Sequence, residues 1–199
     1  MAINHQIEAF ISALATDRYY VWDHFLDSSE IQAIREAIPD NELHEARIGH
    51  KDTLQNNKAI RGDQTLWLDT KMAPPIQDYL VKMDEIRQIL NREFFLGLKD
   101  FETHFARYEP GTYYKMHIDN PKGVSRRKVT TVLYLNEDWK PGDGGELEVY
   151  NLAQEKILTV EPIAGRIIFF LSEDFPHEVT TTNVVRDSIT GWYLTEKLL

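Results

Sequence analysis

The chain has 199 residues, with 32 acidic and 22 basic side chains and a formal charge of −10. This length predicts a single domain, 1–199, with a substantial core, and 11% aromatic residues argue against intrinsic disorder. The absence of cysteine excludes disulfides, thiolate zinc sites and thiol nucleophiles. The acidic surface disfavours nucleic acid, and the longest apolar run, 167–171, is too short to span a membrane. We therefore expect a cytoplasmic protein with neither nucleic-acid nor membrane partners.

The first third of the chain has the periodicity of helices. Apolar residues over 7–14 recur at spacings of three and four, which predicts one amphipathic helix. Asp27 followed by Glu30 predicts a capping box at the start of a second helix. A third helix is predicted to begin near Pro74, because proline suits the first helical turn, and its apolar stripe runs over 76–94.

A polar segment without periodicity, 46–58, lies between the second and third predicted helices. A long polar stretch inside a compact domain is usually mobile or functional. We therefore expect residues 1–99 to form a helical support that carries a mobile loop at 46–58.

From residue 101 the pattern changes to a period of two, which is typical of strands. The predicted strands are 101–108, 115–119, 128–135, 146–150, 157–160, 166–171, 177–180 and 185–194. Turn signals containing proline and glycine separate them. Helices in one block and strands in another favour an α+β, mainly β fold. We expect a double-stranded β-helix (jelly roll, cupin-like) over 100–199, with the N-terminal helices packed on it.

Two histidines precede a carboxylate by two residues, the spacing that places both side chains on one face of a strand. About one such pair is expected by chance, so the spacing alone is weak. His50 and Asp52 lie in the unpatterned loop, where a solvated surface is the better interpretation. His117 and Asp119 lie at the end of a predicted strand, where they would share a face.

His177 offers a third ligand from a later β segment. Two imidazoles and one carboxylate suit non-haem iron(II), and zinc accepts the same set. The alternative is a core histidine with a satisfied hydrogen bond. A zinc hydrolase is disfavoured, because no glutamate or histidine is obviously placed as its general base.

Arg186 would share one face of the last predicted strand with Ser188, Thr190 and Trp192. An inward-facing arginine is costly unless an anion pairs with it, and its guanidinium matches a carboxylate at two points. Tyr134 could add a hydroxyl group to the same carboxylate. The alternative is a surface arginine paired with an acidic neighbour, which would contribute little stability.

The sequence carries His117-x-Asp119, His177 and Arg186 in this order. In this it resembles the iron(II)- and 2-oxoglutarate-dependent prolyl 4-hydroxylases, most closely the hypoxia-inducible-factor prolyl hydroxylases and their bacterial relatives. The collagen-type enzymes carry lysine at the position of Arg186, so arginine favours the hypoxia-inducible-factor branch. The segments that carry the resemblance are Ile60-Arg61-Gly62-Asp63, Tyr114-x-x-His117-x-Asp119-Asn120-Pro121, Val129-Thr130 through Tyr134-Leu135-Asn136, Asp138-Trp139, Gly144-Gly145-x-Leu147, Phe169-Phe170, Pro176-His177-Glu178-Val179 and Arg186 with Ile189-Thr190-x-Trp192-Tyr193.

The resemblance implies a role for each matching residue. It implies iron ligands at His117, Asp119 and His177, and a cosubstrate carboxylate held by Arg186 and Tyr134. Further cosubstrate-pocket positions are implied at Tyr108, Leu147, Val179, Thr190 and Trp192. Substrate-binding positions are implied at Asp63, Tyr114, Arg127 and Trp192, with Arg127 and Asp63 as a charged pair near the substrate entrance and 46–58 as a closing loop.

The implied activity is hydroxylation of a prolyl residue in a protein, with iron(II), 2-oxoglutarate and O₂ consumed to give succinate and CO₂. Ascorbate is a further candidate cofactor, and oxygen sensing is the role of the branch. Elongation factor Tu is a candidate target if the source is bacterial. The alternatives are hydroxylation of another residue or of a free amino acid, and a binding module without turnover.

Overall fold

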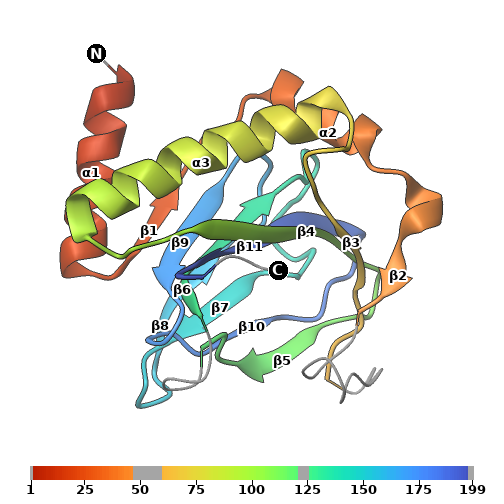
Figure 1. Ribbon diagram of the computed structural model, residues 1–199. Coiled ribbons are helices and arrows are strands. Elements are labelled where there is room, and N and C mark those ends of the chain that lie inside the picture. The colour runs from red at the N-terminus through yellow and green to blue at the C-terminus, as the bar shows by residue number, and fades with distance from the viewer. Residues whose placement is uncertain (1, 47–59, 121–125, 197–199) are drawn as a thin grey trace.

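The computed structural model describes residues 2–46, 60–120 and 126–196. Two antiparallel sheets face each other, and the helices cover the outer face of the larger sheet (Figure 1). This is the jelly roll with N-terminal supporting helices that the sequence predicts.

Three α-helices form the support: α1 (Ala2–Thr16), α2 (Ser28–Ala37) and α3 (Pro74–Phe94), with a 3-10 helix η1 (Asp40–Glu42) after α2. The predicted capping box is confirmed, because the carboxylate of Asp27 accepts from the backbone N–H groups of Ser29 and Glu30, and Glu30 accepts from the N–H of Asp27. None of the described helices combines the length and the apolar composition that crossing a bilayer requires.

The larger sheet has seven strands. In spatial order they are β1 (Tyr19–Trp22), β9 (Ile167–Leu171), β6 (Arg127–Tyr134), β11 (Arg186–Leu194), β4 (Asp100–Tyr108), β3 (Gln64–Trp67) and β2 (His44–Glu45). The smaller sheet contains β5 (Tyr114–His117), β10 (His177–Val179), β7 (Leu147–Tyr150) and β8 (Lys156–Val160).

Alternation along the central strands divides the interior into two cores. On β11, Ile189 and Tyr193 point toward the helices and pack with the buried stripe of α3. The intervening residues, such as Arg186 and Thr190, belong to the other face, which looks toward the smaller sheet. The space between the two sheets therefore holds the polar groups of the site beside a second apolar cluster that includes Ile168 and Phe170, while the helix side holds the first.

The predicted division of the chain at residue 99 needs correction. Residues 1–99 contribute strands β1, β2 and β3 to the larger sheet in addition to helices. Residues 47–58 of the predicted loop, including His50 and Asp52, lie outside the described residues. The strand that carries His117 ends at that residue, so Asp119 follows the strand instead of lying within it.

Candidate active site

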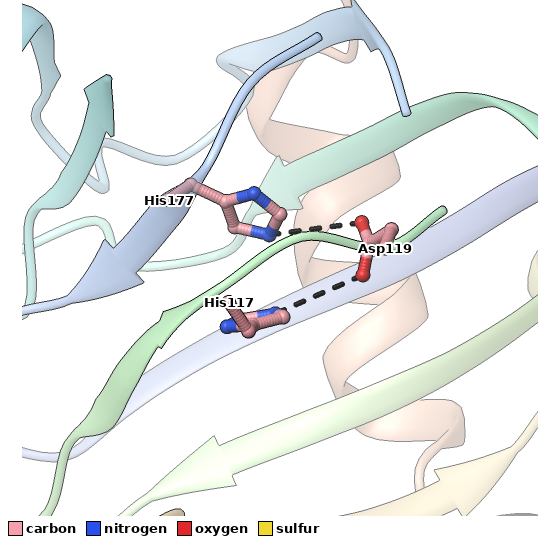
Figure 2. Close-up of side chains that lie close together, drawn as sticks. All are labelled: His117, Asp119 and His177. Carbon is pink, nitrogen blue, oxygen red and sulfur yellow. Dashed lines mark ion pairs between the residues drawn. The ribbon is translucent and has the colours of Figure 1, made fainter. Parts of the chain in front are cut away.

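Three side chains converge at one end of the space between the sheets. His117 ends β5 and lies opposite His177, the first residue of β10, in the antiparallel register. The two Nε2 atoms lie 3.7 Å and 3.6 Å from the carboxylate oxygens of Asp119 (Figure 2). One ligand atom from each residue lies within 4.8 Å of the other two, which is close enough for all three to bind one metal ion.

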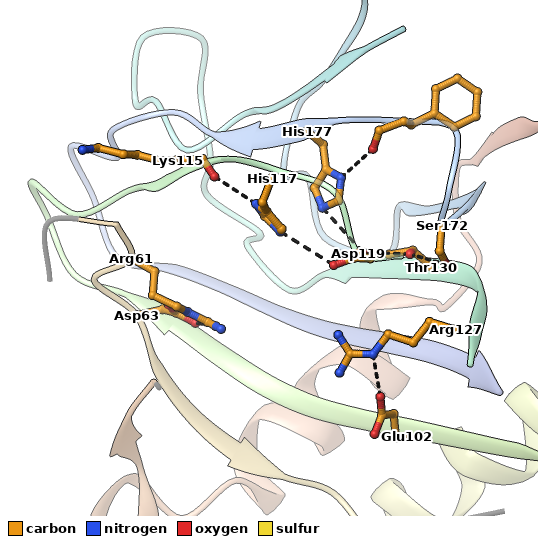
Figure 3. A network of polar contacts seen from close by, with 11 residues as sticks. Arg61, Asp63, Glu102, Lys115, His117, Asp119, Arg127, Thr130, Ser172 and His177 are labelled. Carbon is orange, nitrogen blue, oxygen red and sulfur yellow. Dashed lines mark hydrogen bonds and ion pairs between the residues drawn. The ribbon is translucent and has the colours of Figure 1, made fainter. Parts of the chain in front are cut away.

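The second nitrogen of each imidazole is held by the backbone. Nδ1 of His117 lies 2.9 Å from the carbonyl oxygen of Lys115, and Nδ1 of His177 lies 3.0 Å from that of Phe175 (Figure 3). A proton on Nδ1 that donates to a carbonyl leaves Nε2 free to bind a metal. The carboxylate of Asp119 accepts from the hydroxyl of Thr130 at 2.8 Å, which fixes its orientation.

The protonation states also suit metal binding. Burial, followed by the effect of His177, lowers the pKa of His117 to about 3. Burial alone would raise the pKa of Asp119, but the two imidazoles outweigh burial and bring that pKa below its usual value. At neutral pH, His117 therefore offers a lone pair and Asp119 a negative charge, as metal ligands must.

Arg186 lies at the other end of the same cavity and is 1% exposed. Its Nε donates to the carbonyl of Gly145 at 2.9 Å and one terminal nitrogen donates to the hydroxyl of Ser188 at 2.8 Å. The remaining terminal nitrogen, Nη2, is buried and has no hydrogen-bond partner within residues 2–46, 60–120 and 126–196. Among the described residues no carboxylate forms an ion pair with Arg186, so its charge is available to an incoming anion.

Two tyrosines hold this guanidinium in place. The rings of Tyr108 and Tyr134 have their centroids 4.9 Å and 5.2 Å from Cζ of Arg186. The hydroxyl of Tyr134 is also buried, with no hydrogen-bond partner among the residues that the structure describes, and burial raises its pKa to about 12. The hydroxyl therefore keeps its proton and can donate to the same carboxylate as Arg186.

The backbone beside Arg186 requires glycine. Gly145 has a φ of +76°, and a Cβ atom there would lie 3.2 Å from Cδ of Arg186. A side chain at this position would both strain the backbone and push on the guanidinium.

The cavity between the triad and Arg186 measures about 270 Å³. It collects most of the residues that the resemblance implied. They are Tyr108, Tyr114, His117, Asp119, Arg127, Leu147, His177, Val179, Arg186, Thr190 and Trp192. Tyr134 packs against Arg186 from behind, and Asp63 lies beside the neighbouring pocket that shares Arg61.

The charged pair near the substrate entrance differs from the expected one. Asp63 accepts from Nε of Arg61 at 2.7 Å, and Arg127 donates to Glu102 at 2.7 Å (Figure 3). The resemblance implied one charged pair, Arg127 with Asp63. The structure instead has two ion pairs, in which Asp63 binds Arg61 and Arg127 binds Glu102. The reason is register: Arg61 and Asp63 are two residues apart and turn to the same side, while Glu102 lies on β4 within reach of Arg127.

Aromatic contacts join these ion pairs to the site. The guanidinium of Arg127 lies 3.6 Å from the ring centroid of Trp192, and that of Arg61 lies 4.5 Å from the ring of Tyr114. Tyr114 in turn stacks on His117 with centroids 3.8 Å apart and planes 16° apart. The residues around the entrance therefore fix one ligand of the triad as well as the cavity wall.

Several residues of the cavity wall were not predicted as site residues, among them His104 and Trp67. The strand pattern could have identified the first, because His104 shares a face with Tyr108 four residues later on β4. No comparable signal marks Trp67, since β3 has only four residues and its pairing with β4 is visible only in three dimensions.

The donor set fits a metal and a dicarboxylate. Two imidazoles and one carboxylate on one side of a site leave coordination positions open, which suits iron(II) and is also compatible with zinc. The unpaired Nη2 of Arg186 and hydroxyl of Tyr134 both donate, so together they match the far carboxylate of a bound 2-oxo acid.

Comparisons with known proteins agree with this geometry. A family model described as the 2OG-Fe(II) oxygenase superfamily matches residues 103–194. A crystal structure of a Pseudomonas putida prolyl-4-hydroxylase is 38% identical, covers 96% of this chain and 100% of that one, and superposes with a TM-score of 0.84. The prolyl hydroxylase from Trichoplax adhaerens, solved with a hypoxia inducible factor peptide, has a TM-score of 0.82 at 24% identity over 98% of this chain and 92% of that one, which shows the fold.

Among curated proteins, the hypoxia-inducible factor prolyl hydroxylase of Caenorhabditis elegans is 30% identical over 190 residues. That match includes 89% of this chain but only 26% of the nematode protein. The chain thus spans about a quarter of this relative.

Proposed function

We propose, from the premise that the chain belongs to the 2OG-Fe(II) oxygenase superfamily, that it hydroxylates a prolyl residue of a protein substrate. The observation that carries this proposal is the buried pair of unpaired donors, Nη2 of Arg186 and the hydroxyl of Tyr134, in the cavity of the metal-ligand triad. The near full-length likeness to the Pseudomonas putida prolyl-4-hydroxylase supports proline as the target residue.

Each part of the cavity has a distinct task in this reaction. His117, Asp119 and His177 would hold iron(II), and Arg186 with Tyr134 would hold the far carboxylate of 2-oxoglutarate. Bound iron(II), with 2-oxoglutarate and O₂, supplies the oxidative decarboxylation that yields succinate and CO₂ and transfers one oxygen atom to a prolyl carbon. The apolar side chains of Leu147 and Val179 keep bulk water from the reacting groups.

The remaining functional assignments belong to the same proposal. Tyr108, Thr190 and Trp192 would border the cosubstrate. The substrate would be bordered by Asp63, Tyr114, Arg127 and, on its other side, Trp192. O₂ is consumed, so the rate would respond to its concentration, and oxygen sensing is the corresponding role. We also propose that the protein is located in the cytoplasm and that elongation factor Tu is a candidate protein substrate.

The decisive experiment measures succinate release with a panel of substrates. The panel contains peptides from elongation factor Tu and from the hypoxia inducible factor oxygen degradation domain, the same peptides with alanine in place of proline, and free amino acids including proline. We expect succinate and a mass increase of one oxygen atom only with proline-containing peptides. Release with free amino acids alone would indicate a different substrate class, and no release under any condition would indicate a binding module.

A further inference from the structure

The cavity wall contains a buried imidazole that the reaction described above does not use. His104 on β4 is 4% exposed and lines the triad cavity. Its ring lies between two indoles, with centroids 5.0 Å from Trp67 and 5.4 Å from Trp192. Both contacts hold the ring plane, so His104 presents a fixed edge to the cavity.

His104 also has an unmet hydrogen bond. Its Nδ1 atom is fully buried and has no hydrogen-bond partner in the part of the chain that the structure describes. Buried polar side chains without a partner are rare in folded proteins and usually have a reason. Burial, reinforced by Arg61 and Arg127, lowers the pKa of His104 to about 3, so the ring is neutral at physiological pH.

A neutral imidazole has one nitrogen that donates and one that accepts. An N–H group buried without an acceptor is rarer than an unmet acceptor. The proton of His104 therefore belongs on Nε2, and the ring has one donor to offer to the cavity.

We propose that His104 is a specificity-determining residue, which donates a hydrogen bond from Nε2 to a carbonyl oxygen of the substrate chain next to the target proline. This inference rests on the proposed function. A prolyl residue has no backbone N–H, so the peptide unit at the target offers only acceptors. A donor on the enzyme is the matching group, and the guanidinium groups of Arg61 and Arg127 already pair with carboxylates.

Position separates His104 from Arg186, the residue that would hold the far carboxylate of the cosubstrate. In the β4–β11 register, His104 lies opposite Thr190, while Arg186 lies opposite Tyr108. The pair His104–Thr190 therefore lies four residues along the strands from the pair Tyr108–Arg186, a distance of about 13 Å. The outer neighbour of His104 is Trp67, which is 56% exposed, so His104 lies toward the opening of the cavity.

The test compares two substitutions at this position. His104→Phe keeps an aromatic ring between Trp67 and Trp192 but removes the donor, whereas His104→Gln restores a donor. With the panel peptide that gives most succinate, we expect the peptide KM to rise roughly tenfold in His104→Phe, the effect of one lost hydrogen bond. His104→Gln should recover most of this loss, and the KM for 2-oxoglutarate should change less than about twofold.

Binding without turnover provides a second readout. Calorimetry under argon, with iron(II) and 2-oxoglutarate present, should show the same rise in the Kd of that peptide for His104→Phe. His5→Phe, the same substitution on the exposed surface of α1, is the matched control and should leave the peptide Kd unchanged.

Two results would overturn the assignment. A rise in the KM for 2-oxoglutarate alone would place His104 at the cosubstrate. Equal rises in both KM values with a lowered Tm and no recovery in His104→Gln would make its role structural.

If the wild-type protein released no succinate with any peptide, the proposed function would fail and this inference with it. If the wild type turned over a peptide that His104→Phe bound equally well, only this inference would fail.

Discussion

The two faces of the seven-stranded sheet are built from the same strands but filled in opposite ways. Toward the helices, Phe169, Ile189 and Tyr193 are fully buried, and the hydroxyl of Tyr193 donates to the carbonyl of Met83 at 2.8 Å. Toward the smaller sheet, Arg186 has a buried donor with no partner among the described residues. The helix face is packed with apolar side chains, with the buried hydroxyl of Tyr79 as an exception, whereas the cavity face keeps several polar groups without partners among the described residues.

This difference shows where the molecule tolerates an unfavourable arrangement. A buried polar group without a partner costs about 1–3 kcal/mol. Arg186, Tyr134 and His104 all carry such a group, and all lie on the cavity side. The apolar packing of the helix face offsets this cost. A bound dicarboxylate would supply partners to Arg186 and Tyr134, whereas the cost at Nδ1 of His104 would remain.

The largest expected effect is on the cavity side. Asp119→Ala should abolish iron(II) binding and 2-oxoglutarate turnover, because the triad loses its only negative charge; the loss should exceed the ~100-fold typical of changes to outer-shell partners. Anaerobic calorimetry with iron(II) measures the loss, with Asp17→Ala, in the exposed turn that follows α1, as the control. Normal iron affinity in Asp119→Ala would contradict the triad.

On the helix side, Phe169→Ala should lower the free energy of unfolding by about 3–5 kcal/mol, since it removes a fully buried ring. That ring packs edge-on against the ring of Phe10, with the two ring centroids 4.9 Å apart. Urea denaturation measures the loss. The folded fraction should bind 2-oxoglutarate with unchanged Kd, and a weaker Kd would show that the two faces are not independent.

Arg186→Ala should weaken 2-oxoglutarate binding by about 2–5 kcal/mol, because a buried charge-assisted pair is lost. Calorimetric titration with the cosubstrate gives the value. Arg35→Ala, which removes a surface ion pair with Glu137, should leave that affinity unchanged. Equal cosubstrate affinity in wild type and Arg186→Ala would remove the assigned role of this arginine.

The smallest expected effect is a pH dependence of stability. The pKa of His104 is about 3 in the folded chain and about 6.5 when unfolded, so below pH 6.5 only the unfolded state takes up this proton. The contribution of His104 to the free energy of unfolding is therefore fully present above pH 6.5 and is lost as the pH falls from 6.5 toward 3. Arg61 and Arg127 favour the neutral ring, while Asp119 opposes them.

From pH 7 to pH 5.5 the wild type should lose about 1 kcal/mol relative to His104→Phe, which lacks the titrating group. Urea denaturation of the metal-free proteins at the two pH values measures this difference. If the free energies of unfolding of wild type and His104→Phe differed by the same amount at both pH values, His104 would have the same pKa in the folded and unfolded states.

Local patterns were sufficient for much of the fold. The capping box of Asp27 and Glu30 and the start of α3 at Pro74 depend on residues close in sequence, and both are confirmed. The strand from 185 to 194 was predicted because alternation fixes its faces. The triad required more, since the His-x-Asp spacing is common by chance. The strand pattern offered His177 as a third ligand, and the family resemblance favoured that interpretation over a core histidine.

Contacts between distant segments were not predictable in this way. Strand β1 is four half-buried residues with no alternation, and it is a strand because β9 pairs with it. The partner of Arg127 depends on which residue of β4 faces it. The spacing on β4 was sufficient to place His104 on the site face, but its enclosure by two indoles depends on strands from both ends of the chain.

The nine residues of β11 serve the core and the site in strict alternation, and this makes the strand intolerant of length changes. A one-residue deletion between Arg186 and Trp192 would exchange the two faces of everything that follows it. Ile189 or Tyr193 would then enter the polar cavity, and Trp192 would enter the apolar layer beneath α3. Substitutions can adjust stability and ligand affinity here one residue at a time, but insertions and deletions would damage both at once, so sequence divergence in this strand should proceed by exchange of side chains only.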